Sequence, residues 1–319
     1  MESTSGGYLP QELTFTNLDE PLFDGAGATK RDLVEYLDAV SDRILPALED
    51  RPLSVIRVHR GQEAFMQKNV PKYTPSWVRT VQWWAETSKR QVSYALCNDR
   101  RTLLWFANQR AVEYHPTLVT AAHPDRMTHL VLDLDPPGAD AFRMAVRAAQ
   151  LVRDALADLG LQGGVKTSGA KGVHVFVPVG SDVAVEDSAA ATRAIAARAE
   201  RIDPGIATTA FMKDDRNGKV FVDATRVAGA TVVAAYSPRV RPGVPVSFPV
   251  AWEDLEEITP SDFTLKTALG HLGSQDPWAA LMPAPQELPD ELIQEGHAIP
   301  TARVQAMHEG KRRARARRA

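Results

Sequence analysis

Two aspartates at the end of one apolar segment are the residues best placed for metal chemistry. Asp133 and Asp135 stand in the segment LVLDLDPP, which two prolines terminate at once. Side chains two residues apart on a β-strand project to the same face, so both carboxylates would lie together while Leu132 and Leu134 face the core. Adjacent carboxylates repel each other, and a bridging divalent cation relieves the repulsion. Asp-x-Asp is often only a solvated strand edge, but two acids interrupting an apolar strand favour a metal site.

A third aspartate, Asp223, ends a second apolar segment, VFVD. Taken alone it is more typical of an ordinary strand end. Beside an Asp-x-Asp pair it would complete a set of three carboxylates, which can hold two divalent ions about 3.5–4 Å apart. One ion would activate an attacking hydroxyl and the other would steady a leaving pyrophosphate.

The segment KTSGAKGVH at 166–174 is a candidate phosphate cradle. Its glycines let the backbone approach a ligand, and amides in such a turn can form an anion nest. Ser168, Lys171 and His174 could all contact phosphate oxygens. The segment is neither a GxxxxGK[ST] loop nor a GxGxxG loop. A glycine turn before a strand is common, so an ordinary structural turn remains an alternative.

Two further basic clusters lie on expected loops. Lys213, Arg216 and Lys219 precede the segment that carries Asp223, and Arg239 and Arg241 stand in YSPRVRPG. Each could be a solvated loop. The functional alternative is a clamp on a triphosphate or nucleic-acid backbone, for which arginine offers bidentate geometry.

The composition restricts the class of protein. A single cysteine, Cys97, excludes a disulfide framework and a Cys-based zinc site. The N-terminus resembles no signal peptide, and no stretch approaches the roughly 18 apolar residues of a membrane span. We therefore expect a cytoplasmic protein that does not enter a membrane. The net charge is −3, but 311–318 reads KRRARARR, and its six positive charges leave −9 on the remainder. This tail is either a solvated end or a nonspecific nucleic-acid arm.

Apolar periodicity and turn signals predict a mixed order of helices and strands. A capping box from Thr29 to Asp32 indicates the start of the first helix. Helices are expected at about 29–47, 140–159 and 186–201, with a short helical region in 253–275. Strands are expected at 54–59, 91–97, 128–135, 172–179, 219–225 and 231–236. Several neighbouring strands favour antiparallel pairing, so the predicted fold class is α+β.

The ordered motifs together resemble the polymerase domain of bacterial ligase D, a member of the archaeo-eukaryotic primase superfamily. The motifs are HLVLDLDPP, TSGAKGVHVFVPV, KVFVDAT and AYSPRVRPG, preceded by TKRDLVEYLDAV, LPALEDRPLSVIR, FMQKNVPKYTPSWV and LLWFANQRAVEYHP. The resemblance implies a primase-polymerase core of central mixed or antiparallel sheets flanked by helices. Together with the composition, it predicts a disordered terminus at 1–12, the primase-polymerase domain at 13–285 and a polar extension with a basic tail at 286–319.

The resemblance also implies an activity and partners. Such a domain adds nucleotides, preferably ribonucleotides, to a primer on a DNA template during gap filling or end joining. It uses Mn²⁺ or Mg²⁺ as two ions, and binds nucleoside triphosphates and DNA with gaps, overhangs or ends. End-joining or repair proteins are expected partners, and the bacterial nucleoid is the expected location.

Site residues follow from the same resemblance. Asp133, Asp135 and Asp223 would be the catalytic metal ligands. The residues expected at the nucleotide are Ser168, Lys171, His174, His115, Arg216 and Arg239. Those expected at DNA are Lys30, Phe65, Lys68 and Lys213, the last on a loop that places primer and template.

Three departures from the family pattern concern the DNA. Glu20 stands where the family often has a lysine that grips a 5′-phosphate beyond the gap, although Lys30, the second such lysine, is kept. Phe65-Met66 replaces a pair of stacking phenylalanines, and Ile56 replaces a position that is often basic. We therefore expect little dependence on a 5′-phosphate.

Alternatives come from two other classes. A haloacid-dehalogenase-type phosphatase also carries Asp-x-Asp at a strand end, but Pro137 stands where that family needs Thr, Ser or Val. A catalytically silent module that bridges DNA ends would not need all three acids. No KxDG ligase motif occurs, so a standalone polymerase domain is expected.

Overall fold

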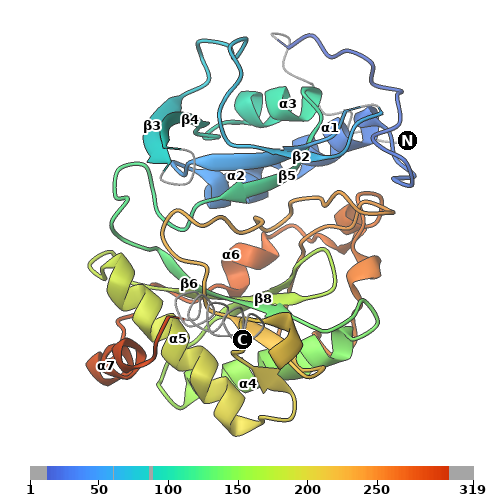
Figure 1. Cartoon of the computed structure of the whole chain (residues 1–319). Helices are drawn as coiled ribbons and strands as arrows, with labels where there is room; N and C mark the ends of the chain where they lie inside the picture. Colours follow the sequence, from blue (N-terminus) through green and yellow to red (C-terminus); the bar gives the residue numbers. More distant parts are fainter. Residues whose placement is uncertain (1–12, 60, 86–88, 302–319) are drawn as a thin grey trace, which may run out of the picture.

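Two β-sheets face each other across the centre of the molecule (Figure 1). The computed structural model describes residues 13–59, 61–85 and 89–301. The sequence expectations for 1–12 and for the basic tail lie outside these residues. The upper sheet has the order β2-β1-β4-β3, with β5 also paired to β1, and the lower sheet has the order β11-β7-β8-β6-β10-β9. This mixed arrangement confirms the predicted α+β class.

The upper sheet and its helices come from the first part of the chain. Its strands are β1 (Leu53–Arg57), β2 (Phe65–Gln67), β3 (Thr80–Ala85), β4 (Arg90–Ala95) and β5 (Ala111–Pro116), and its helices are α1 (Lys30–Ala39), α2 (Ser41–Leu48) and α3 (Arg100–Asn108). The capping box is present, because the Thr29 hydroxyl accepts from the Asp32 amide and the Asp32 carboxylate accepts from the Thr29 amide. The single helix expected over 29–47 is wrong, since the chain leaves helical geometry at Val40 and Pro46 lies inside α2.

The lower sheet carries the acids. Its strands are β6 (His129–Asp135), β7 (Gly164–Thr167), β8 (Val173–Pro178), β9 (Ala207–Thr208), β10 (Val220–Asp223) and β11 (Pro249–Val250). All its pairings are antiparallel except β9 with β10. Helices α4 (Phe142–Ala157) and α5 (Val185–Ile202) cover its lower face (Figure 1). Leu130, Leu132 and Leu134 are fully buried against them, so alternation turns the acids of β6 toward the upper sheet.

The segment 231–236 is not the strand that its apolar sequence predicts. It runs beside β5, where the amides of Val232 and Ala234 donate to the carbonyls of Pro116 and Tyr114, but Tyr236 then takes a left-handed φ of 65°. Elsewhere, 253–275 contains only two short 3₁₀ turns, Pro260–Asp262 and Ala268–His271, before the five-residue helix α6 (Pro277–Leu281). No helix among the described residues has the length and apolar character to cross a membrane.

The described fold continues beyond residue 285. Helix α7 (Asp290–Ala298) packs on α5, and Gly296 sits against the backbone of Ala190. A Cβ added at Gly296 would lie 2.8 Å from the Ala190 Cα and still nearer its carbonyl oxygen. Arg198 and Arg201 of α5 also pair with Glu295 at 2.7 Å. The polar sequence after 285 therefore includes a docked helix.

This close approach predicts that Gly296→Ala destabilises the protein. The new methyl group must push α7 away from α5, which we expect to lower the free energy of unfolding by about 3 kcal/mol. Urea denaturation followed by circular dichroism would measure the loss. Gly270→Ala is the matched control, because open space surrounds that position and a change within about 0.5 kcal/mol is expected there. Equal stability of the two variants would contradict the docking of α7.

Candidate active site

Four polar side chains form one row across the lower sheet. Asp133 pairs in register with Asp223 on one side and with His174 on the other, and His174 pairs with Lys166. Directly opposed residues share a face of the sheet, so β7, β8, β6 and β10 each contribute one member of this row. Asp135 lies two residues beyond Asp133 and therefore on the same face. The structure thus brings together the three acids that the sequence singled out.

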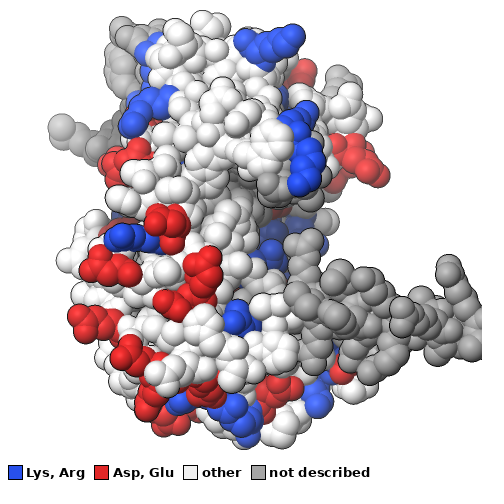
Figure 2. All heavy atoms as spheres, turned by 60° about the vertical axis from the view of Figure 1, so that its left-hand side comes forward, with Lys and Arg blue, Asp and Glu red and all other residues white. Residues whose placement is uncertain are grey.

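The acids open into a cleft of about 630 Å³ between the two sheets. Figure 2 shows Lys and Arg side chains at the hollow between the upper and lower parts, whereas Asp and Glu gather on the outer surface of the lower part. A chain with a net negative charge therefore still presents a positively charged cleft. The described residues that line the cleft include the three acids and Met66, His115, Ser168, Lys171, His174, Lys213, Arg216, Arg226, Arg239 and Arg241.

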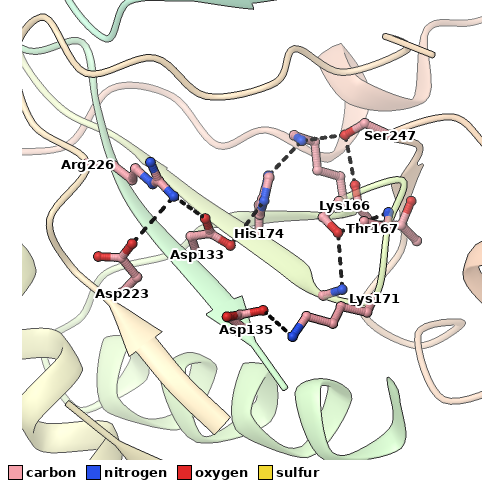
Figure 3. A network of polar contacts seen from close by, with 12 residues as sticks. Asp133, Asp135, Lys166, Thr167, Lys171, His174, Asp223, Arg226 and Ser247 are labelled. Atoms are coloured by element: carbon pink, nitrogen blue, oxygen red, sulfur yellow. Dashed lines mark hydrogen bonds and ion pairs between the residues drawn. The ribbon is translucent and has the colours of Figure 1, made fainter. Parts of the chain in front are cut away.

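One guanidinium bridges two of the acids (Figure 3). Nη2 of Arg226 lies 3.0 Å from Oδ2 of Asp133 and 3.5 Å from Oδ2 of Asp223. Asp223 also accepts from the amide of Thr225 at 2.8 Å and from its hydroxyl. Burial alone would raise the pKa of Asp133, but the contacts with His174 and Arg226 outweigh it and hold that pKa below its usual range. Asp133 is therefore held ionised beside a cation that it shares with Asp223.

Asp135 faces two other cations. Its Oδ1 lies 2.9 Å from Nζ of Lys171, and its Oδ2 lies 3.3 Å from Nη1 of Arg216. Lys171 also donates to the carbonyl of Pro136 at 2.6 Å, and the guanidinium of Arg216 stacks 3.9 Å from the ring centroid of Phe221. Lys171 and Arg216, both expected at the nucleotide, thus form ion pairs with Asp135 in this structure.

The acids suit a hard divalent cation by chemistry. Carboxylate oxygens are the ligands that Mg²⁺ and Mn²⁺ prefer. Asp133 and Asp223 already share one positive group, so a divalent ion in place of the Arg226 guanidinium would face the same two carboxylates. Within the described ranges, no three His, Cys, Asp or Glu side chains are gathered closely enough to form a ready-made metal site. A second ion would further require Lys171 to release Asp135.

The loop between β7 and β8 is held by Ser168. Its hydroxyl accepts from the amides of Ala170 and Gly172 at 3.2 and 3.1 Å. Gly169 has a φ of 66°, and a Cβ there would meet Cγ of Arg239 at 2.7 Å, which explains why glycine is needed. Arg239 in turn donates to the carbonyl of Ser168. Ser168 therefore shapes the loop, while Lys171 at its tip reaches the cleft.

A buried amine stands behind His174. Nζ of Lys166 lies 2.9 Å from Nδ1 of His174 and 2.5 Å from Oγ of Ser247, and Lys166 is fully buried. Burial lowers the pKa of the Lys166 amine well below its usual range. Burial, reinforced by Lys166, also lowers the pKa of His174 to about 4, so its imidazole is neutral near neutral pH. The opposite ring nitrogen, Nε2, lies 3.3 Å from Oδ1 of Asp133.

Glu113 organises the upper wall of the cleft. Its carboxylate lies 2.8 Å from Nε2 of His115 and 2.9 Å from Nε of Arg239, and it accepts from the amide of Val240 at 2.8 Å. Burial would raise the pKa of Glu113, but His115 and Arg239 hold it below its usual range. This network brings together His115 and Arg239, both expected at the nucleotide, and ties β5 to the loop that follows 231–236.

The residues predicted to contact DNA do not all line the cleft. Phe65 stacks on His59 with ring centroids 5.4 Å apart, whereas Met66 lines the cleft. Lys68 is exposed, and Lys213 lines the cleft.

The amine of Lys30, expected at DNA, is hydrogen-bonded within the protein. It is buried and donates to the carbonyl of Thr16 at 2.6 Å, and burial beside Arg110 lowers its pKa to about 8. Arg110 in turn pairs with Glu20 at 3.3 Å. The helical spacing of apolar residues that predicted α1 gives no sign that its first residue turns inward.

Sequence reasoning missed Lys166, Glu113 and Arg226 as members of the site. The signal for Glu113 was available, because Glu113 and His115 are two residues apart on a strand and so share a face. Lys166 stands in a short segment, GVKT, that reads as the start of a loop. Arg226 lies in a loop, three residues after Asp223. No periodicity in the sequence predicts that its side chain reaches the acids of both β6 and β10.

Comparison with known proteins agrees with this geometry. The family model described as "LigD, primase-polymerase domain" matches residues 29–278. The bifunctional non-homologous end joining protein LigD of Bacillus subtilis is 34% identical over 83% of this chain and 43% of its own length. The multifunctional non-homologous end joining DNA repair protein LigD of Mycobacterium tuberculosis is 32% identical over 79% of this chain and 34% of its own length. The chain thus spans less than half of these relatives.

A solved structure gives the same result. The polymerase domain of Mycobacterium tuberculosis ligase D, determined in complex with DNA, has a TM-score of 0.73 and 29% sequence identity, covering 86% of this chain and all of that one. The row of acids, the cation-lined cleft and these matches agree, and the chain belongs to the LigD primase-polymerase domain family of nucleotidyltransferases.

Proposed function

We propose that this protein adds nucleotides, preferably ribonucleotides, to the 3′ end of a primer on a DNA template, in gap filling or end joining. The observation that carries the proposal is the juxtaposition of Asp133, Asp135 and Asp223 on the cleft face of one sheet, surrounded by cations. The DNA-bound relative supports DNA as the partner. End-joining or repair proteins are proposed as further partners because the relatives are named for that process.

The three acids would hold Mn²⁺ or Mg²⁺. Two such ions, when bound, activate the attacking hydroxyl and stabilise the leaving pyrophosphate. No protein nucleophile is then required, since positioning and electrostatics dominate phosphoryl transfer.

The remaining residues would handle the triphosphate. Lys171 and Arg216 now pair with Asp135, and we propose that they exchange this carboxylate for phosphate oxygens when nucleotide enters. Arg239 and His115, both fixed by Glu113, would contact the nucleotide from the upper wall. His174 would donate from Nε2, the ring nitrogen that faces Asp133 and the cleft.

The DNA contacts would come from the upper sheet and the loop at Lys213. We propose that Met66 faces the bound DNA in the cleft, while Phe65 and Lys68 contact it at the outer edge of β2. A 5′-phosphate beyond the gap would meet Glu20 in a site where Lys30 already binds a backbone carbonyl. We therefore propose weak recognition of that phosphate.

Primer extension on gapped duplexes tests the proposal. The comparison should include ribo- and deoxynucleotides, Mn²⁺ and Mg²⁺, and a 5′-phosphate or 5′-hydroxyl at the gap. We expect manganese-stimulated ribonucleotide addition with less than about a fivefold effect of the 5′-phosphate, because a surface contact of that kind is worth under about 1 kcal/mol. No incorporation under any condition would overturn the proposed polymerase activity. A strong 5′-phosphate dependence would overturn only the inference from Glu20.

A further inference from the structure

Lys166 is a fully buried amine for which the proposed function has no role. It lies on β7, behind His174 as seen from the cleft, with its Nζ 5.4 Å from the ring centroid of Phe176. Its hydrogen-bond partners are Nδ1 of His174 and Oγ of Ser247. Burying a lysine amine away from water costs free energy unless hydrogen bonds compensate, so the partners of Lys166 indicate its role.

The direction of each hydrogen bond follows from the chemistry of the acceptors. An ionised carboxylate only accepts, so Nε2 of His174, facing Asp133, must carry the proton. Nζ of Lys166 carries at least two hydrogens, and its two partners are Oγ of Ser247 and Nδ1 of His174, so it donates one hydrogen to each and Nδ1 accepts. The Ser247 hydroxyl donates to the carbonyl of Thr167 at 2.8 Å, which leaves its oxygen to accept a second hydrogen from Lys166.

These bonds form one directed chain from Thr167 through Ser247, Lys166 and His174 to Asp133 (Figure 3). We infer that Lys166, anchored by Ser247, is a positioning residue that holds the His174 ring with its Nε2–H directed at Asp133 and the cleft. A ring rotated by half a turn would present carbon to both Lys166 and Asp133. The fixed ring keeps one donor at the acid whose orientation the proposed reaction needs. The inference rests on the proposed function for its effect on nucleotide addition, but the state of the ring can be measured without it.

Nitrogen NMR of the histidine rings tests the inference directly. Protein labelled with ¹⁵N-histidine, with His174 assigned by a His174→Gln variant, is expected to show His174 protonated at Nε2, with Nδ1 at the shift of a hydrogen-bonded acceptor. Lys166→Met keeps the buried stem and removes the donor. It should move Nδ1 toward the shift of an imine nitrogen without a partner. Ser247→Ala should produce a smaller shift in the same direction.

Activity supplies the second readout. Lys166→Met should lower kcat/KM for nucleoside triphosphate about tenfold, the size of effect typical of residues that orient a ligand of the reacting centre. Lys266→Met is the matched control, because Lys266 is exposed and does not line the cleft. Urea denaturation of each variant establishes that it is folded.

The outcomes separate clearly. A wild-type His174 protonated at Nδ1 overturns the inference, and so does an unchanged Nδ1 shift in Lys166→Met. Wild-type kcat/KM in Lys166→Met would also overturn it. If the nitrogen shifts behave as expected but wild-type protein adds no nucleotide, the positioning role stands and the proposed function fails.

Discussion

Replacing Asp133 or Asp135 by asparagine is expected to lower nucleotide addition by at least about a thousandfold, equivalent to about 4 kcal/mol of transition-state stabilisation. Asparagine keeps the shape of each side chain but removes the negative charge on which divalent metal binding depends. The loss should appear in single-turnover primer extension at saturating Mn²⁺.

Binding of gapped DNA distinguishes catalysis from a bridging role. Fluorescence anisotropy should give dissociation constants within about threefold of the unaltered protein, because removing an acid from a cleft does not weaken its affinity for phosphates. Asp254→Asn is a suitable control, since Asp254 is exposed and lies on a loop apart from the row of acids. Nucleotide addition by Asp133→Asn at more than a tenth of the normal rate would contradict the assignment of the acids.

Removing Arg226 should strengthen metal binding. Its guanidinium occupies the position between Asp133 and Asp223 that a divalent ion would need. A hydrogen bond to a charged group contributes about 1.5–3 kcal/mol, so Arg226→Gln should raise Mn²⁺ affinity about tenfold. Electron paramagnetic resonance of unbound Mn²⁺, without DNA or nucleotide, measures the change.

Without metal, Arg226→Gln should be less stable than the unaltered protein. Asp133 and Asp223 would lose their shared counter-charge, so the metal-free protein should unfold at lower urea concentration, and Mn²⁺ should restore the difference by mass action. Arg241→Gln removes one positive charge from the same cleft without touching the acids, and it should alter Mn²⁺ affinity far less. Equal effects of the two substitutions would mean that Arg226 acts only through the general potential of the cleft.

The sequence predicts the acids well because strand alternation is local. LVLDLDPP determines both where β6 ends and which face its carboxylates take, and the capping box from Thr29 to Asp32 determines where α1 begins. The strand predicted at 231–236 is wrong for the opposite reason. Its apolar side chains satisfy the core, but its path beside β5 depends on tertiary contacts and on the left-handed Tyr236.

The contacts of individual polar side chains also cannot be predicted from local sequence patterns. Arg226 reaches Asp133 across 93 positions of sequence, and Lys166 reaches Ser247 across 81. The inward turn of Lys30 likewise depends on a carbonyl in the segment before α1. Pairings of this kind follow from how the sheets stack, which periodicity within one element does not encode.

The alternation of β6 makes correct folding and assembly of the site a single event. A slip of one residue in its pairing would turn Asp133 and Asp135 toward α4 and α5 and bring three leucines to the cleft. Burying two ionised carboxylates against apolar helices is prohibitively costly, so a misregistered chain would not persist as a folded protein. An insertion or deletion of one residue inside β6 should therefore leave aggregates or degradation products rather than an intact, inactive domain. Every folded copy would then carry its acids on the cleft face, and removal of misfolded chains would also remove chains with a misassembled site.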